Sequence, residues 1–179
     1  MPRDTERLRF RRWEERDAEA LFALARDPAV GPICGWPPHE SVENSLRTIR
    51  TVFSAPEAYA ICLRGEDTPI GCVELKLNGS TDMADRDDAC ELGYWLGVPY
   101  WNRGYMSEAV RELLRYAFVD LNMAEVWCGY YDGNERSKRV QEKAGFLYQW
   151  TTDDVDVPLM GETRKGHVNR ITREQWERL

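Results

Sequence analysis

The chain has 179 residues, of which 42% are hydrophobic, and a formal net charge of -7 at pH 7. This length allows one sizeable hydrophobic core, so we expect a single domain over residues 1–179. The acidic balance argues against sequence-independent binding to nucleic acid, which needs a surplus of lysine and arginine to displace counterions from the phosphates.

The N-terminal residues and the cysteines are typical of a cytoplasmic protein. Residues 1–10 carry several charges and lack the apolar core of a signal peptide, and no segment approaches the ~20 apolar residues that span a membrane. The 5 cysteines form no Cys-x-x-Cys pair and mostly lie in apolar runs, which predicts free, buried thiols. His39 and His167 are the only histidines, so a histidine zinc site or a Ser-His-Asp triad has little to build on.

The first part of the chain predicts a strand followed by two helices. Residues 8–13 read as a strand, and Asp17 is a plausible N-cap for a helix with apolar residues on one side. The segment 28–38 contains Gly-Pro and Gly-Trp-Pro-Pro, which predicts a loop within the domain. Ser41 then caps a second helix, whose apolar positions recur at helical spacing.

A sheet is expected to begin after these helices. Residues 59–63 and 70–77 are predicted to form a hairpin of two buried strands. The polar stretch 78–88 has no apolar period and is expected to be a surface loop that leads to a further strand at 90–97.

The second part of the chain predicts one long helix and then a strand, a short helix and two more strands. Apolar residues over 106–121 follow the i, i+3, i+4, i+7 spacing, so the apolar face of this helix is expected to lie on the sheet. Residues 125–131 read as a strand and 135–144 as the short helix. The two last strands precede Thr172-x-x-Gln175, a capping-box signature.

The junction between the strand at 90–97 and the helix at 106–121 is the most informative segment. Free backbone N–H groups at a helix start point the same way, and the helix dipole adds partial positive charge, so such a junction can hold a pyrophosphate. Gly104 allows the backbone to approach a ligand closely, and Arg103 can add a charge-assisted contact. An ordinary strand-to-helix turn with a surface arginine is the alternative explanation.

Two motifs carry a family resemblance. The sequence Glu-Leu-Gly-Tyr-Trp-Leu at 91–96, followed by Tyr-Trp-Asn-Arg-Gly-Tyr-Met-Ser-Glu-Ala at 100–109, resembles the GNAT superfamily of N-acetyltransferases, in particular its ribosomal-protein N-terminal acetyltransferase (RimJ/RimL-like) branch. The block 134–146 is similar to that family's Asn-x-x-Ser helix ending in Gly-Phe. The resemblance covers nearly the whole chain. It implies the GNAT (acyl-CoA N-acyltransferase) fold, a mixed α/β (α+β) domain with a central, mostly antiparallel twisted sheet that is flanked by helices and splayed at the cofactor cleft.

The same resemblance implies that acetyl-CoA binds at this junction. Backbone amides over 101–106 would cradle the coenzyme A pyrophosphate, residues 96–98 would pair with the pantetheine arm, and the helix at 135–144 would contribute two polar side chains. The family usually has a small residue where Met106 stands, which implies a reshaped cradle. The implied cofactor-binding residues are Leu96, Gly97, Val98, Trp101, Asn102, Arg103, Gly104, Tyr105, Met106, Asn134 and Ser137.

Acetyl transfer from a thioester to an amine needs a donor for the oxyanion and a proton for the departing thiolate. A backbone N–H near Leu96 is the expected oxyanion donor. Ser137 is the candidate proton donor, because the tyrosine that many superfamily members carry later in this helix is replaced by Gln141. The hydroxyl of Ser137 could instead bond the backbone of its own helix start.

The amine also has to lose a proton. Glu91 is the first candidate for the catalytic base and Glu74 the second, acting directly or through water. Many members of this branch carry an acidic residue in the last strand region, where the stretch 162–169 of this chain has a lysine. Glu162 and His167 therefore stay open as alternatives.

The expected acceptor is a primary amine, and the case for a strong base is weak. At pH 7, forming the neutral amine costs about 1.4 kcal/mol for an α-amine with a pKa of about 7.7 to 8.0. The same step costs about 4.6 kcal/mol for a lysine side chain. This difference favours a protein N-terminal α-amine of the ribosomal-protein type. A small-molecule amine such as an aminoglycoside or a polyamine is the alternative.

The acceptor-binding residues and the oligomeric state are less closely defined by the sequence. The family places acceptor-binding residues around 34–39, so Trp36 is a candidate substrate-binding residue together with Glu91, although core packing explains Trp36 equally well. The acidic cluster 82–88 could attract a cation or be a solvated loop. The sequence is compatible with a monomer or a homodimer.

Two other function classes compete with an enzyme. A sensor would bind acetyl-CoA or coenzyme A without turnover. A nucleotide-binding doubly wound domain is disfavoured, because helices precede the hairpin and neither Gly-x-x-x-x-Gly-Lys-Ser/Thr nor Gly-x-Gly-x-x-Gly occurs.

Overall fold

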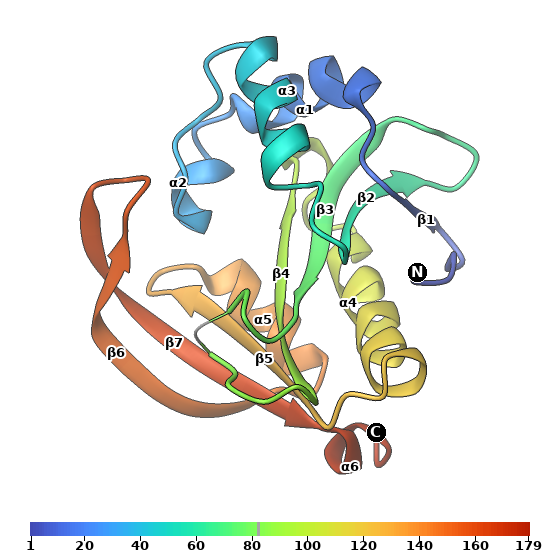
Figure 1. The fold of residues 1–179 in the computed structure, drawn as a ribbon, viewed down its shortest axis with the longest axis vertical. Helices are drawn as coiled ribbons and strands as arrows, with labels where there is room; N and C mark the ends of the chain where they lie inside the picture. The colour runs from blue at the N-terminus through green and yellow to red at the C-terminus, as the bar shows by residue number, and fades with distance from the viewer. Residues whose placement is uncertain (82) are drawn as a thin grey trace.

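Seven strands form one twisted sheet at the centre of the molecule (Figure 1). The computed structural model describes residues 1–81 and 83–179. The strand order is β1-β2-β3-β4-β5-β7-β6, and every neighbouring pair is antiparallel except β4 with β5. This mixed, mostly antiparallel sheet confirms the expected fold class. The strands are β1 Leu8–Arg11, β2 Ala58–Leu63, β3 Pro69–Lys76, β4 Ala89–Leu96, β5 Glu125–Tyr131, β6 Leu147–Val157 and β7 Glu162–Thr172.

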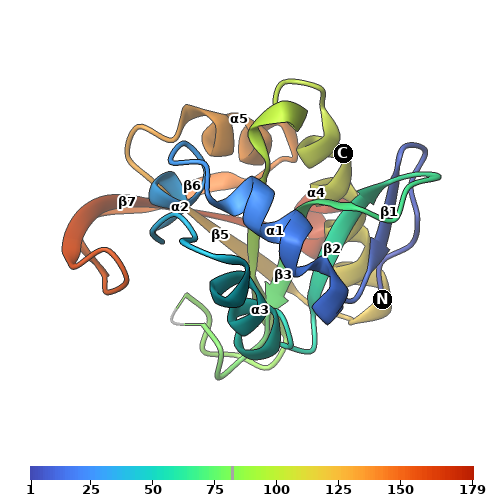
Figure 2. The ribbon, with the colours of Figure 1, turned by 90° about the horizontal axis from the view of Figure 1, so that it is seen from above.

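Helices cover both faces of the sheet (Figure 2). Successive side chains of a strand point to opposite faces, and the central strands are apolar on both, so each face needs its own cover. On one face Cys72 and Trp95 belong to a core shared with α1 and α3, and on the other Val73 and Leu92 belong to a larger core shared with α4. The helices are α1 Ala18–Ala25, α2 Gly31–Cys34, α3 Val42–Thr51, α4 Tyr105–Arg115, α5 Glu135–Lys143 and α6 Arg173–Trp176.

Two local features near the N-terminus differ from the sequence-based expectations. Asp17 does occupy the N-cap position of α1, but its side chain makes no cap hydrogen bond there. Its carboxylate instead accepts from the Arg11 guanidinium at 2.7 and 2.8 Å and from the Glu14 N–H at 2.9 Å. The segment 28–38, predicted to be a loop, contains the one-turn helix α2, which ends at Gly35 with φ of 92°.

The long helix predicted over 106–121 changes its hydrogen-bonding pattern near its end. The α-helix extends to Arg115, and the next turn, Tyr116–Asp120, is π-helical. The buried apolar face continues through both parts. Periodicity therefore predicted the buried face correctly, although the wider final turn was not predicted.

The other predicted helix starts and the first hairpin are confirmed. The Ser41 hydroxyl accepts from the Asn44 N–H at 3.1 Å and so caps α3. Thr172 and Gln175 form a complete capping box at the start of α6. Strands β2 and β3 pair as an antiparallel hairpin.

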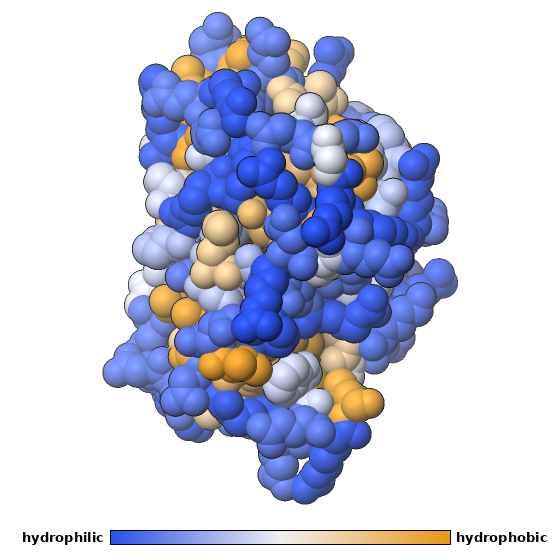
Figure 3. All heavy atoms as spheres, turned by 90° about the vertical axis from the view of Figure 1, so that its right-hand side faces the viewer, coloured by the Kyte–Doolittle hydropathy of each residue, from blue (hydrophilic) through white to orange (hydrophobic). Residues whose placement is uncertain are grey.

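The cysteines are mostly buried, and the surface is mostly hydrophilic on the face drawn in Figure 3. All 5 cysteines are free thiols, and only Cys34 is partly exposed. No helix in the described ranges is long and apolar enough to cross a membrane. On the face drawn in Figure 3, hydrophilic residues dominate and the apolar ones form small separate groups.

Strands β4 and β5 are paired only at one end. Beyond this short parallel ladder both strands continue but diverge. The other edge of β5 pairs with β7 along the whole length of β5. The resulting gap is the splayed sheet that the family resemblance implied. The paired residues are Ala89 with Glu125, Cys90 with Val126 and Glu91 with Trp127.

Candidate functional site

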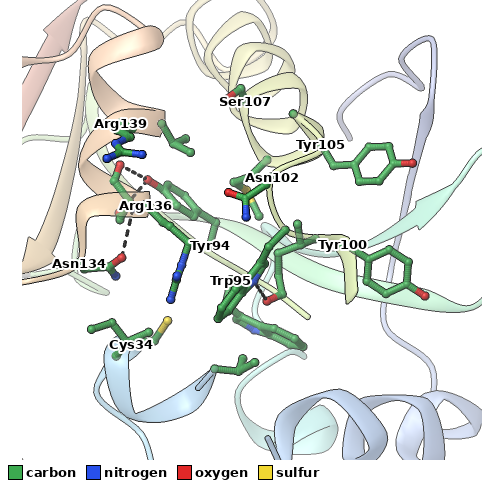
Figure 4. Close-up of a pocket in the computed structure, with 18 of the residues that line it drawn as sticks. Cys34, Tyr94, Trp95, Tyr100, Asn102, Tyr105, Ser107, Asn134, Arg136 and Arg139 are labelled. Atoms are coloured by element: carbon green, nitrogen blue, oxygen red, sulfur yellow. Dashed lines mark hydrogen bonds between the residues drawn. The ribbon is translucent and has the colours of Figure 1, made fainter. Parts of the chain in front are cut away.

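The gap between β4 and β5 opens into a cavity of about 300 Å³ (Figure 4). Its walls come from the end of β4, the segment that leads into α4 and the start of that helix, one side of α5, and α2. These elements are far apart in the sequence, and the fold brings them together around the point where the two strands part. Concave sites built in this way are where small molecules usually bind.

A run of free backbone amides lies at the start of α4. In the part of the chain that the structure describes, no N–H from Asn102 to Ser107 donates a hydrogen bond within the protein, whereas those of Trp101 and Glu108 do. Asn102 and Gly104 have positive φ angles of 59° and 78°. Such left-handed residues turn neighbouring amides toward a common point, and the dipole of α4 adds positive potential there. The segment therefore fits a diphosphate.

Basic side chains from α5 line the same cavity. Arg136, Arg139 and Lys143 contribute to its wall, and the Arg136 guanidinium lies over the Trp101 ring, 3.8 Å from its centre. Figure 4 shows Arg136 and Arg139 projecting from α5. Together with the free amides, these cations complement a ligand that carries several phosphate groups.

The structure brings eight of the eleven predicted cofactor-binding residues to this cavity. Three others lie outside its wall. A Cβ on Gly97 would meet the Leu24 side chain at 2.6 Å, Val98 packs against the smaller core, and the Arg103 carbonyl accepts a hydrogen bond from Arg7. The eight that line the cavity are Leu96, Trp101, Asn102, Gly104, Tyr105, Met106, Asn134 and Ser137.

The backbone of Leu96 faces the gap. The Gly97 N–H donates to the Ile70 carbonyl at 2.9 Å, so at this residue the backbone points toward β3. Backbone N–H groups alternate in direction along a strand, so the Leu96 N–H points the other way, toward the open side of β4. The carbonyl of Leu96 accepts from Trp101 Nε1 at 2.7 Å, which fixes this backbone segment.

The hydroxyl of Ser137 is held by side chains. It lies 2.9 Å from the Tyr94 hydroxyl and accepts from Gln141 Nε2 at 3.1 Å. Gln141 is fully buried, and its Oε1 accepts from Asn169 Nδ2 at 2.7 Å. The alternative role, bonding at the helix start, falls to Asn134, whose side chain caps α5 by accepting from the Ser137 N–H at 3.1 Å.

Tyr94 is a candidate functional residue that the motif comparison missed. Its side chain lines the cavity, and burial raises the pKa of Tyr94 well above its usual range, so the phenol stays protonated. Strand alternation places Tyr94 on the same side of β4 as Leu92 and Leu96, the side of α4 and α5. That alternation was the signal that could have found it.

A second cavity of about 320 Å³ lies beside the first. It is enclosed by β3, β4, β5 and β7 and by α2, which Figure 1 shows beside the tip of the β6–β7 hairpin. The two cavities have part of their walls in common, so they meet at the gap and could admit two ligands to one point. The shared residues are Ile33, Cys34, Tyr94, Trp95, Asn134 and Ser137.

Glu91 is buried in the second cavity and both of its oxygens are engaged. Lys76 stands directly opposite Glu91 in the β3–β4 register, and its Nζ lies 2.9 Å from Glu91 Oε1. The Thr81 hydroxyl donates to Glu91 Oε2 at 2.5 Å. Glu91 is therefore held as half of an ion pair.

Glu74 lines the same cavity but is less constrained. Within the described residues its carboxylate accepts no hydrogen bond, and its nearest cation is Lys76 Nζ at 3.8 Å. Burial raises the pKa of Glu74, Lys76 partly opposes this, and the charge of Glu91 adds to the increase. A carboxylate of this kind is a suitable proton acceptor.

The remaining predicted residues divide between the cavity and the surface. Trp36 lines the second cavity and also packs against the core that contains Trp95, so its role in substrate binding stays a prediction. His167 lines the cavity, but its two ring nitrogens bond Asp132 and Thr151, each at 2.9 Å.

Two acidic candidates do not reach either cavity. Glu162 pairs with Arg164 at the surface. The acidic cluster at 82–88 begins at Asp82, which lies outside the described residues, and Asp87 and Asp88 bond to neighbours in their own loop. Among the residues that the structure describes, no group of His, Cys, Asp and Glu side chains could hold a metal ion.

Comparisons with known proteins point to one family. A family model described as an acetyltransferase (GNAT) domain matches residues 7–147. The chain is 27% identical over 148 residues to an uncharacterized N-acetyltransferase, YoaA, of Bacillus subtilis, which covers 80% of this chain and 81% of the relative.

Solved structures have the same fold. The crystal structure of an acetyltransferase of the GNAT family from Bacillus anthracis matches with a TM-score of 0.84 and 24% identity, and covers 97% of this chain and 99% of that one. A spermidine N-acetyltransferase from Vibrio cholerae, solved in complex with CoA and spermine, matches with a TM-score of 0.73 and 16% identity, and covers 97% and 99%.

Proposed function

We propose, from the premise that the chain belongs to the GNAT family of acetyltransferases, that its acceptor is the α-amine of a protein N-terminus, of the ribosomal-protein type. The chain is an acetyl-CoA-dependent N-acetyltransferase. The proposal for the acceptor rests on two cavities that share part of their walls at the β4–β5 gap, and on Glu74 beside them. Within the described residues the Glu74 carboxylate accepts no hydrogen bond, and its nearest cation, Lys76 Nζ, is 3.8 Å away.

The first cavity suits acetyl-CoA. When bound, acetyl-CoA supplies an activated thioester. The free amides between Asn102 and Ser107 fit its pyrophosphate, and Arg136, Arg139 and Lys143 add positive charge. Beyond Glu91 the edge of β4 is not paired with β5, which leaves room for the pantetheine arm beside this strand.

Glu74 is the residue that we assign as the base. Its free oxygens and its raised pKa suit it to accept a proton from the ammonium form of the acceptor, directly or through a water molecule. Glu91 was the first choice from the sequence, but its bonds to Lys76 and Thr81 suit it better to positioning Lys76. His167 has no ring nitrogen free in this arrangement.

Two groups at the gap are placed to support charge and proton movement. The Leu96 N–H is a rigid donor for the negative charge that develops on the acetyl oxygen. Ser137 can give a proton to the departing sulfur, and Tyr94, hydrogen-bonded to it, can restore that proton. Because the two cavities meet, the amine attacks directly with both substrates bound, and no acyl-enzyme is needed.

The strength of the base favours an α-amine. Glu91 is engaged by Lys76 and Thr81, which leaves Glu74 as the assigned base. A single carboxylate can offset a deprotonation cost of about 1.4 kcal/mol, the value for an α-amine at pH 7, more readily than the ~4.6 kcal/mol of a lysine. The motifs at 91–109 and 134–146 support the ribosomal-protein branch of the family.

Two peptides of equal length, which differ in their N-terminus and at one internal position, test the acceptor. The first has a free N-terminus and no lysine, and the second has an acetylated N-terminus and one internal lysine. We expect release of free CoA thiol with the first peptide and a kcat/KM at least tenfold lower with the second. Equal values, or a preference for lysine, would refute the α-amine assignment. Binding of CoA without thiol release from any amine would favour the sensor.

A further inference from the structure

The second cavity contains an unequal set of charges. Two carboxylates, Glu74 and Glu91, and one ammonium group, Lys76, line it, which leaves one net negative charge. His167 stands at its wall with Asp132 beyond it, outside the lining. The cavity can therefore neutralise one positive charge of a ligand, because the charge of its other carboxylate is balanced by Lys76.

The ion pair determines which carboxylate is available. Lys76 Nζ lies 2.9 Å from Glu91 and 3.8 Å from Glu74, and Thr81 takes the other oxygen of Glu91. An ammonium group that enters the cavity therefore finds Glu74 as its partner. A second positive charge on the same ligand would approach the ammonium of Lys76, and repulsion in a partly buried site is weakly screened.

Most of the remaining wall is apolar or aromatic, and Asn134, Ser137 and His167 are its polar members. Trp36 and Trp95 pack edge to face with ring centres 5.8 Å apart, and Tyr130 and Tyr131 of β5 also contribute to the lining. Met83, Val155 and Val168 add further apolar surface. Such a surface gains free energy when it covers an apolar or aromatic group, and gains little from a hydrated polar chain.

The roof of the cavity is fixed in place. Arg164 from β7 donates to the Pro32 carbonyl of α2, and its guanidinium lies over the Tyr131 ring at 5.1 Å. A Cβ on Gly35 would meet the Tyr131 hydroxyl at 3.0 Å, so α2 and β5 are in close contact. Because α2 is held against β5 and β7, the volume of about 320 Å³ limits the size of the group that the cavity accepts.

We propose, as an extension that rests on the proposed transferase function, that this cavity selects acceptors with one primary amine on an apolar or aromatic body and rejects polycations. Lys76 is the residue that excludes the second charge, and Trp36 contributes to the apolar wall. For a protein acceptor, the cavity favours N-termini whose first side chain is apolar. Polyamines and aminoglycosides are poor acceptors because each carries several ammonium groups.

Two matched pairs of small acceptors separate charge from apolarity. Hexylamine and 1,6-diaminohexane have the same chain length and differ by one ammonium group. Phenylalaninamide and glycinamide have the same α-amine and differ by one apolar side chain. We expect kcat/KM to be about tenfold or more higher for hexylamine and for phenylalaninamide, within the range by which apolar pockets discriminate.

Variants assign each preference to its residue. Lys76→Met should raise kcat/KM for 1,6-diaminohexane relative to hexylamine, and Trp36→Ala should reduce the preference for phenylalaninamide. Because Lys76→Met leaves Glu91 without its cation, the double variant Lys76→Met with Glu91→Gln is measured beside it. The control is Lys165→Met, which removes a lysine that pairs with Asp153 outside both cavities and should leave both preferences unchanged.

Calorimetric titration of the four amines into the protein with CoA present gives a second readout that needs no turnover. If the amines bind in the predicted order but release no free CoA when acetyl-CoA is supplied in the turnover assay, the site is upheld and the transferase function is refuted. Turnover in which the diamine or glycinamide equals or exceeds its partner would refute the selectivity and leave the transferase intact. Failure of all four amines to bind would overturn the acceptor site itself.

Discussion

The side chain of Glu74 lies over Gly93, its partner in the β3–β4 register, so closely that a Cβ on Gly93 would stand 2.7 Å from Glu74 Oε1. Real contacts of this kind are not that short, so the carboxylate can occupy its place only because residue 93 has no side chain. The position of the assigned base therefore depends on a glycine in the neighbouring strand.

Gly93→Ala should displace the carboxylate and reduce activity. We expect kcat/KM to fall at least tenfold, because a proton acceptor must lie within hydrogen-bond reach of its target, while the Kd for CoA stays unchanged. The check is a double-mutant cycle with Glu74→Gln. If the two losses simply add, Gly93 acts independently of Glu74 and this account is wrong.

Glu74→Gln should lower kcat by about 10²- to 10⁴-fold, as expected for loss of a general base. Burial raises the pKa of Glu74, so the base is ionised only above a pH higher than is usual for a glutamate. In the wild type, kcat should fall as the pH drops through that raised pKa, and this acidic limb should be absent from the variant. A rate profile of identical shape in both proteins would contradict the assignment.

The same raised pKa predicts an effect on stability. A folded-state pKa above the unfolded value means that the stabilising contribution of Glu74 is present at low pH and is lost as the pH rises through the folded pKa. Glu74→Gln should therefore unfold at higher urea concentration than wild type at pH 7, and the difference should shrink toward pH 4. Urea midpoints at the two values test this, and a variant that is less stable at pH 7 would count against it.

Ser137→Ala should lower kcat by about 10²-fold and leave the Kd for CoA unchanged, if Ser137 is the proton donor. Tyr94→Phe should have a smaller effect, because Gln141 still donates to the Ser137 hydroxyl. Steady-state kinetics and calorimetry on both variants measure this. A larger loss in Tyr94→Phe than in Ser137→Ala would move the proton donor to Tyr94.

Gly104→Ala should weaken CoA binding and reduce stability by about 1 kcal/mol, because residue 104 has a φ of 78° that side chains rarely adopt. Gly65→Ala is the matched control. Its φ is 87°, no atom lies within 4 Å of a Cβ there, and its turn is remote from both cavities. Calorimetry should show reduced CoA affinity only for Gly104→Ala, and equal affinities would argue against the amide cradle.

The sequence predicted the elements better than their contacts. Helical periodicity identified the buried face of α4, and the motif at 100–109 contained the amide run at its start. Neither signal contains distances between strands. The pairing of Lys76 with Glu91 follows from the β3–β4 register, which depends on how both strands are packed, and for this reason Glu91 was placed ahead of Glu74.

Side chains that act across elements were the hardest to anticipate. Tyr94 reaches Ser137 from a strand 43 residues earlier in the chain, and Arg136 stacks on Trp101 across the cavity. Such contacts depend on the splay of the sheet. The one-turn helix α2 could not be predicted from local helix propensity either. A helix of four residues is not stable on its own, so its formation depends on the residues packed around it.

The interrupted ladder between β4 and β5 makes the sheet incomplete in the free enzyme. On the open side of β4 the amide of Leu96 has no strand partner, so its hydrogen should exchange rapidly with deuterium in solvent water. A ligand arm that carries its own amide groups can take the position of the absent strand segment. The bound ligand would then extend the β-sheet at the edge of β4, and the rate of deuterium uptake at β4 should fall when the ligand binds.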